Sequence, residues 1–258
     1  MNRIDKLFMN QKKGILSVYF TAGYPHPDST VEIINELSSA GADMIEIGVP
    51  FSDPIADGPV IQHSNSVALK NGMSLKLLFR HLNNIRDHTS IPLIIMSYCN
   101  PIVNFGMEKF CIACKAAGID GVIIPDLPPE IYVEEFRSLF KSYGLKNILM
   151  ISPQSDKNRI LEIDKMSTGF IYMVSSSSTT GVRQGFPDNN LEYFSRVKKM
   201  RLKNPVLIGF GVYDKKTFRI VCDYANGGII GSAFIKMLDG RNLCNTSIRN
   251  FIKEIKGI

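Results

Sequence analysis

The chain of 258 residues is organised around the stretch ADMIEIGVPFSDPIADGP, residues 42–59. Its first half alternates as a short β-strand does, with Met44, Glu46 and Gly48 on one face and two isoleucines on the other. Its second half holds three prolines and a glycine, which favour neither strand nor helix. The stretch therefore predicts a buried strand that leads into a long polar loop.

Glu46 is the unusual residue of this strand, because a buried carboxylate without a partner is costly. Such a group is either paired or has its pKa raised toward neutrality. A second acid, Asp57, lies on the loop that follows the strand. Proton transfer can use one carboxyl group poised to exchange a proton and another kept ionised in a wetter place. The alternative is that Glu46 is a glutamate at the exposed edge of a sheet.

Short apolar segments recur along the whole chain, each followed by a helical pattern. They begin near residues 15, 44, 92, 121, 147, 169, 206 and 228. Apolar strands that alternate with helices indicate a parallel sheet covered by helices. Eight such units, with no G-x-G-x-x-G after the first, favour a closed (β/α)8 TIM barrel over an open doubly wound sheet. We expect one α/β domain over residues 1–258, an extra N-terminal helix over Arg3–Gln11, and long loops after strands 2 and 6.

Glycine-containing turns follow the last three predicted strands. They are Ser175–Gly181, Gly209-Phe210-Gly211 and Gly231-Ser232-Ala233. A phosphate group needs converging backbone N–H groups, which glycine lets approach closely, together with hydroxyl donors. The loops after strands seven and eight of such a barrel commonly bind phosphate. We therefore expect a phosphate site closed by a lid over residues 175–188; the alternative is that these glycines only end strands.

Composition and charge argue against several classes of protein. The chain is 45% hydrophobic and 21% charged, without an apolar run of membrane-spanning length. Its net charge of +6 comes from scattered basic residues, so nucleic acid is not expected as a partner. The N-terminus is unlike a secretory signal, which makes the cytoplasm the expected location. Five irregularly spaced cysteines predict reduced thiols, and Cys111-Ile112-Ala113-Cys114 lacks the further ligands of a metal site.

The sequence resembles the tryptophan synthase alpha chain family. The most specific similarity is the segment EIGVPFSDPIADGPVIQ, residues 46–62, and the match runs from Leu7-Phe8 almost to the end of the chain. Supporting pieces are Tyr98 with Asn100, Pro125-Asp126-Leu127-Pro128, Thr180-Gly181, Gly209-Phe210-Gly211 and Gly231-Ser232. The resemblance implies a (β/α)8 barrel lyase that cleaves indole-3-glycerol phosphate into indole and glyceraldehyde 3-phosphate, a retro-aldol reaction.

The resemblance also assigns roles to individual residues. Glu46 matches the family's general acid/base, which protonates indole C3 and assists loss of the side-chain hydroxyl proton. Asp57 matches the aspartate that hydrogen-bonds the indole N–H. The resemblance further implies a set of substrate-binding residues, with Phe210 beside the phosphate: Tyr98, Tyr172, Thr180, Gly181, Phe210, Gly211, Gly231 and Ser232.

The same resemblance implies an α2β2 heterotetramer with a tryptophan synthase beta chain. That beta chain holds pyridoxal phosphate and receives indole through a tunnel, so no cofactor is expected in this chain. Loops around Ser52–Pro59, Tyr98–Phe105 and Asp126–Glu130 are expected to face the partner. The sequence departs from the family at the lid, where Ser178-Thr179 replace the first two residues of Gly-Val-Thr-Gly, and at Tyr24, where many relatives carry Asp.

Two other interpretations stay open at this point. One is another barrel enzyme acting on a phosphorylated sugar or indole. Such an enzyme would be expected to carry a catalytic Lys or Asp near a strand end, and no Lys lies inside a predicted strand. The other is a subunit whose main role is to bind and activate a partner. Indole release by the isolated chain, with and without a beta chain, separates these interpretations.

Overall fold

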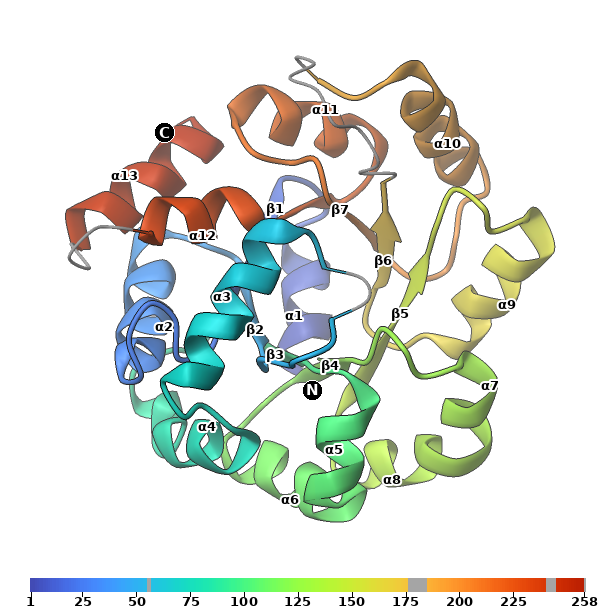
Figure 1. Ribbon diagram of the computed structural model, residues 1–258. Coiled ribbons are helices and arrows are strands. Elements are labelled where there is room, and N and C mark those ends of the chain that lie inside the picture. Colours follow the sequence, from blue (N-terminus) through green and yellow to red (C-terminus); the bar gives the residue numbers. More distant parts are fainter. Residues whose placement is uncertain (55–56, 176–184, 240–244, 258) are drawn as a thin grey trace.

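The fold is a closed barrel of parallel strands surrounded by helices (Figure 1). The computed structural model describes residues 1–54, 57–175, 185–239 and 245–257. In these residues eight strands follow one another around the barrel in chain order, and β8 pairs with β1 to close it. This confirms the predicted TIM barrel. The strands are β1 (Ile15–Thr21), β2 (Met44–Gly48), β3 (Leu93–Met96), β4 (Gly121–Ile123), β5 (Lys146–Ile151), β6 (Ile171–Val174), β7 (Val206–Gly209) and β8 (Gly227–Ile230).

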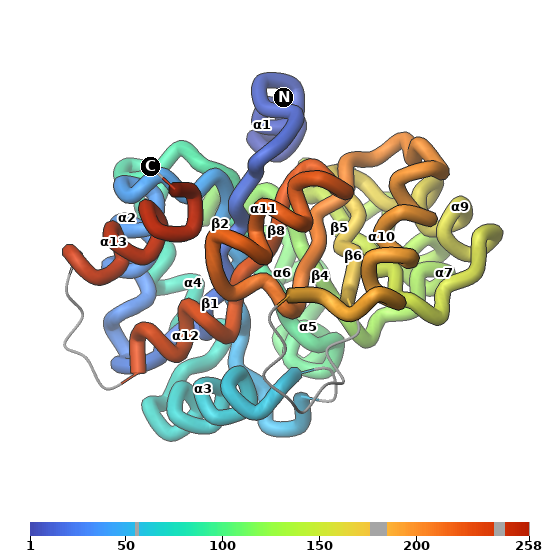
Figure 2. Tube along the Cα trace, turned by 90° about the horizontal axis from the view of Figure 1, so that it is seen from above, coloured from blue at the N-terminus to red at the C-terminus, as the bar shows by residue number. Residues whose placement is uncertain are grey.

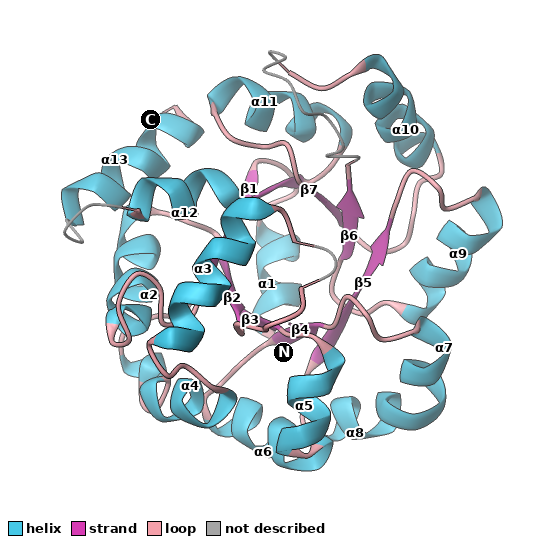
Figure 3. Ribbon diagram, in the orientation of Figure 1, coloured by secondary structure: helices cyan, strands magenta, loops and turns pink. Residues whose placement is uncertain are grey.

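Helices form the outer layer (Figure 3). They are α1 (Arg3–Asn10), α2 (Ser29–Ala40), α3 (Pro59–Lys70), α4 (Leu75–His81), α5 (Cys99–Phe105), α6 (Met107–Ala116), α7 (Pro129–Ile131), α8 (Arg137–Ser142), α9 (Lys157–Met166), α10 (Asp188–Lys199), α11 (Lys215–Tyr224), α12 (Ser232–Leu238) and α13 (Asn245–Lys256). A 3-10 turn, Ile85–Asp87, precedes β3, and a π-helical segment, Tyr132–Phe136, joins α7 to α8. Within the described ranges, no helix is long and apolar enough to cross a membrane.

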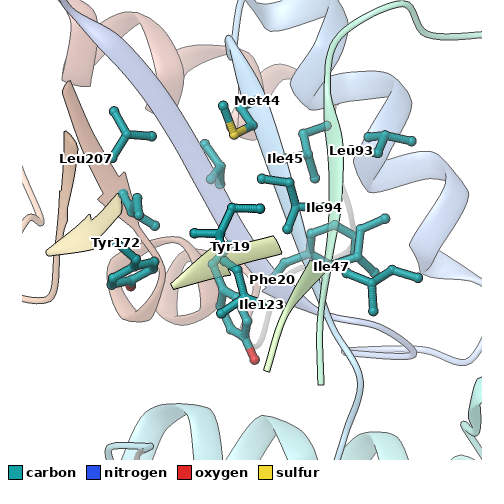
Figure 4. Packing of buried hydrophobic residues seen from close by; sticks show 14 of the residues in the cluster. Tyr19, Phe20, Met44, Ile45, Ile47, Leu93, Ile94, Ile123, Tyr172 and Leu207 are labelled. Carbon is teal, nitrogen blue, oxygen red and sulfur yellow. The ribbon is translucent and has the colours of Figure 1, made fainter. Parts of the chain in front are cut away.

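The pairing register decides which side chains face the barrel interior. Tyr19 pairs with Glu46, and Glu46 pairs with Ile94 on the next strand. Residues paired in register point to the same face of a sheet, so these three side chains share the interior. The alternate residues of β2, such as Ile47, pack beneath the helices. Figure 4 shows the hydroxyls of Tyr19 and Tyr172 directed away from Met44, toward the C-terminal ends of the strands.

The N-terminal helix closes the opposite end of the barrel. Figure 2 places α1 at the end of the barrel remote from α3. Ile4 of α1 is fully buried, and a Cβ added to Gly121 would lie only 2.9 Å from the Ile4 side chain. The absence of a side chain at Gly121 therefore makes room for the helix to plug the floor of the barrel.

The buried carboxylate of Asp120 stabilises this end of the barrel. Asp120 precedes β4 and is 3% exposed. Its carboxylate pairs with Arg86 at 2.6 Å and with Arg3 of α1 at 3.1 Å. It also accepts a hydrogen bond from the Leu93 backbone N–H at 3.0 Å. The interaction therefore ties α1, β3 and the turn before β4 together.

Two expectations from the sequence are wrong. Residues 99–105, expected as part of a loop, form the helix α5, in which Pro101 lies in the first turn, where its missing N–H costs nothing. The carboxylate of Asp126 accepts a hydrogen bond from the Cys99 N–H at 2.8 Å and holds the start of this helix. A lysine does lie in a strand, since β5 begins at Lys146. Its ammonium group pairs with Asp5 of α1 at 2.8 Å, so it stabilises the floor of the barrel.

We predict that Asp120→Ala lowers the free energy of unfolding by about 3 kcal/mol, because it leaves two arginines without their buried partner. Denaturant titration measures this loss. The matched control is Glu130→Ala, which breaks the ion pair between Glu130, 52% exposed at its side chain, and Arg159, and costs less than about 1 kcal/mol. Equal losses in the two variants would contradict a structural role for Asp120.

Candidate active site

Glu46 lies on β2 inside the barrel and is fully buried. The Ser17 hydroxyl of β1 donates a hydrogen bond to Glu46 Oε1 at 2.8 Å. Glu46 Oε2 has no hydrogen-bond partner among the described residues. Burial raises the pKa of Glu46 to about 7, and the hydrogen bond from Ser17 opposes that rise. The carboxyl group is therefore inside the barrel and not at an exposed sheet edge, and its protonation changes near neutral pH.

Asp57 lies just before α3 and is partly buried. The Asn65 side chain of α3 donates a hydrogen bond to Asp57 Oδ2 at 3.2 Å, and Gln62 donates one to the Asp57 backbone carbonyl at 2.9 Å. Burial raises the pKa of Asp57, against the effect of Asn65. Asp57 is thus less hydrated than the sequence suggested. Asp57 is nevertheless more exposed than Glu46, and its neighbour Asn65 favours the ionised form.

Two tyrosines connect these acids. Burial raises the pKa of Tyr172 well above its usual range, and the charges of Glu46 and Asp57 add to the rise. Burial also raises the pKa of Tyr19, with Asp57 as the next contribution. A Cβ at Gly48 would lie 2.2 Å from the Tyr19 hydroxyl oxygen. Tyr19 therefore lies against the end of β2, beside both acids.

Tyr19 and Ser17 were not predicted from the sequence as site residues. Residues 17 and 19 alternate along the first predicted strand as Met44 and Glu46 do along the second, but only the pairing of the two strands shows that all four share the interior. Tyr98, which the resemblance placed at the substrate, is buried and packs on Phe51 with ring centroids 5.1 Å apart. The charge of Tyr98 contributes to the raised pKa of Tyr19, so its ring lies at the same end of the barrel.

A cavity of about 760 Å³ opens beside the last two strands. Its wall includes all four described residues of the expected phosphate site, Phe210, Gly211, Gly231 and Ser232. Gly58 and Pro59, which follow Asp57, form part of the wall as well. The cavity therefore joins the Asp57 loop to the glycine turns.

Ser175 and Tyr19 each contact a residue of the cavity wall. The Ser175 hydroxyl donates to the Phe210 carbonyl at 2.8 Å and ties the end of β6 to the turn after β7. Glu46 does not line the cavity. A Cβ at Gly231 would lie 3.2 Å from the Tyr19 ring, so this ring reaches from β8 to Gly48 at the end of β2. Tyr19 thus lies between the glycine turns and the strand that carries Glu46.

Some expected features fall outside the described residues or outside the site. Thr180 and Gly181 lie outside the described residues, as do Ser178 and Thr179 of the expected lid. Among the residues that are described, no group of three or more His, Cys, Asp or Glu side chains could hold a metal ion. Tyr24 is buried, and its ring stands edge-on to His63 at 6.5 Å.

The arrangement combines a buried acid with a cavity that can accept an anion. A carboxyl group with a pKa near 7 can deliver and take back a proton at neutral pH. A second carboxyl group at the mouth of the barrel can stabilise positive charge. Glycine turns at the C-terminal ends of β7 and β8 are the usual phosphate site of such barrels. The site is therefore suited to proton transfer within a phosphorylated substrate.

Comparisons with known proteins agree with this geometry. The sequence profile of the tryptophan synthase alpha chain family matches residues 6–256. The chain is 53% identical to the tryptophan synthase alpha chain of Flavobacterium psychrophilum, over 99% of this chain and 100% of the relative. It is 51% identical to that of Christiangramia forsetii, over 100% of both chains.

A solved structure gives the same result. One chain of the tryptophan synthase complex from Pyrococcus furiosus superposes with a TM-score of 0.85 and 35% identity, covering 96% of this chain and 99% of that chain. The chain therefore belongs to the tryptophan synthase alpha chain family, and its activity is the lyase reaction of that family, the cleavage of indole-3-glycerol phosphate in tryptophan biosynthesis.

Proposed function

We propose that Glu46 is the acid–base group of this cleavage and that Asp57 stabilises the charge that develops on the indole ring. The observation that carries the proposal is the state of the Glu46 carboxyl group. It is fully buried, one of its oxygens is held by Ser17, and its pKa is raised to about 7 by burial. At neutral pH such a group is present in both protonation states and can serve first as acid and then as base.

The cleavage begins with protonated Glu46, which delivers its proton to C3 of the indole ring. The ring nitrogen then carries positive charge, and the Asp57 carboxylate accepts a hydrogen bond from the ring N–H. The Glu46 carboxylate next removes the proton of the hydroxyl group on the carbon attached to the ring. As the aldehyde forms, the carbon–carbon bond breaks, its electron pair returns to the ring, and Glu46 is protonated again.

The phosphate of the substrate is assigned to the glycine turns after β7 and β8. Gly211, Gly231 and Ser232 line the cavity there, and its wall also carries one basic and one acidic residue, Lys236 and Glu254. Backbone N–H groups at such turns, together with the Ser232 hydroxyl, suit a phosphate dianion. Thr180 and Gly181, which lie outside the described residues, are assigned to substrate binding, and Tyr172 and Tyr98 to positioning of the ring.

The partner is assigned as a tryptophan synthase beta chain in an α2β2 heterotetramer, with pyridoxal phosphate held by the beta chain. The similar Pyrococcus furiosus chain was solved as part of a tryptophan synthase complex, which supports a partner of this kind. Val103 of α5, on the expected surface, is 56% exposed, and Ile131 of α7, the residue after the expected segment Asp126–Glu130, is 36% exposed. The family's place in amino-acid biosynthesis supports the expected cytoplasmic location.

We predict that Glu46→Gln lowers kcat for indole release by at least about a hundredfold, because an amide cannot exchange the proton. Indole formation by the purified chain, with and without beta chain, measures the effect. The matched control is Glu162→Gln on the exposed face of α9, which keeps the wild-type rate. Turnover by folded Glu46→Gln close to that of the control would remove Glu46 from the chemistry.

The raised pKa of Glu46 also predicts a pH-dependent stability. The folded-state pKa of about 7 lies above the ordinary value of 4.5. The protonated carboxyl group therefore makes its full contribution to the free energy of unfolding below the ordinary pKa, and this contribution is lost as the pH rises through 7. Glu46→Gln has no charge to bury, so its free energy of unfolding should exceed that of wild type by up to about 3 kcal/mol at high pH. Denaturant midpoints at about pH 5 and about pH 8.5 test this. A difference between variant and wild type that does not change with pH would contradict a buried acid.

The partner surface gives a further prediction. Val103→Asp should weaken binding of the beta chain by at least about tenfold, because it places a charge in an apolar contact. The matched control is Ile112→Asp, which changes a side chain of similar exposure, 50%, on α6. Calorimetric titration with the beta chain compares the two variants. A larger loss for the α6 variant would place the interface elsewhere.

A further inference from the structure

We infer that Ser17 is a positioning residue for Glu46, holding Oε1 so that Oε2 is the oxygen that exchanges the proton with the substrate. This inference rests on the proposed role of Glu46 and extends it to a residue on a different strand. It follows from the hydrogen bond between the two side chains, from their complete burial, and from the second oxygen, which has no hydrogen-bond partner in the described part of the chain.

The position of Ser17 is fixed by the barrel register. Ser17 pairs with Met44 and Tyr19 pairs with Glu46, so Ser17 faces the interior one layer deeper than the carboxyl group. The hydroxyl reaches Glu46 Oε1 at 2.8 Å from the floor side of the barrel. Because both side chains are on neighbouring rigid strands, the contact fixes the orientation of the carboxyl group.

The direction of the hydrogen bond from Ser17 to Oε1 favours a proton on the other oxygen of Glu46. A serine hydroxyl that donates to Oε1 occupies that oxygen in the charged state of Glu46. When Glu46 is protonated, the serine remains the donor if the proton sits on Oε2, whereas a proton on Oε1 would make the serine oxygen the acceptor. Oε2 has no partner among the described residues, so its proton is free to be passed to a bound substrate. Ser17 thus directs the reactive oxygen without touching the substrate.

Ser17 is one of several polar groups that face Glu46. Tyr19 of β1 and Tyr172 of β6 face it as well, β3 contributes the apolar Ile94, and Asp57 of the following loop acts on both tyrosines. Of these groups, Ser17 is the one whose hydrogen bond lowers the pKa of Glu46 against the effect of burial. Removing the hydroxyl should therefore raise the pKa of Glu46.

The test is a graded series at position 17 in the full chain with its beta chain. Ser17→Ala removes the donor, and Ser17→Cys replaces it with a weaker donor of similar size. We expect Ser17→Ala to lower kcat about tenfold, as for loss of a hydrogen bond to a charged group, with KM changed less than about twofold. Because Glu46 starts protonated, kcat falls with rising pH, and this fall should move to higher pH by about half a unit or more. Ser17→Cys should lie between wild type and Ser17→Ala.

A matched control separates positioning from simple loss of stability. Ser167→Ala removes another buried serine, whose hydroxyl donates to the Phe170 carbonyl at 2.9 Å. Ser167 precedes β6, so it lies at the end of the barrel opposite the C-terminal ends of the strands. This variant should lose comparable stability and keep the pH profile of wild type. If the pH profile of kcat for Ser17→Ala superimposes on the profile for Ser167→Ala, the inference is overturned. If Ser17→Ala does not fold, the same comparison is made with Ser17→Cys.

A direct titration distinguishes failure of this inference from failure of the proposed function. Infrared difference spectra record the Glu46 carboxyl band against pH, and Glu46→Gln identifies that band. A band that titrates at the same pH in wild type and Ser17→Ala overturns the role of Ser17, even where Glu46→Gln is inactive. An active Glu46→Gln overturns the proposed function itself. A band that moves to higher pH in Ser17→Ala, together with an inactive Glu46→Gln, supports both.

Discussion

The burial of one carboxyl group inside a closed barrel is the constraint on which the site depends. Around Glu46 the described part of the barrel supplies apolar side chains, two tyrosines and the Ser17 hydroxyl as a donor. A carboxylate in such a place is costly, so the group holds its proton up to neutral pH. The burial of Glu46 therefore destabilises the fold above neutral pH, and the same burial makes Glu46 a proton donor.

The destabilising buried acid lies toward one end of the barrel, and the interactions that stabilise the barrel lie at the other end. At the N-terminal end, Asp120 is matched by two arginines and a backbone N–H, and Ile4 fills the floor. At the C-terminal end, Glu46 has an oxygen without a partner among the described residues. Unsatisfied polar groups persist where the surrounding structure is firm enough to hold them. The floor of the barrel therefore serves stability, while its mouth serves chemistry.

The sequence predicted the strands and the acid pair because each leaves a local signal. Near-continuous apolar runs mark the strands, and a glutamate within one of them marks the buried acid. Helix α5 was missed because Asn100-Pro101 is typical of a turn, although proline also suits the first turn of a helix. Ser17 and Tyr19 were missed because a serine or tyrosine in a strand is ordinary. Their importance arises from pairing with β2, and a single strand does not reveal its partner's register.

The first strand emerges as the common support of both acids. Ser17 holds Glu46 directly. Thr21, two steps beyond Tyr19 along the same face, lies 2.7 Å from the Ser64 hydroxyl of α3. The next residue of that helix, Asn65, donates to the Asp57 carboxylate. One strand thus fixes the buried acid through a single hydrogen bond and the outer acid through a helix. The distance between the two acids is therefore set by secondary structure, although Asp57 itself lies on a loop.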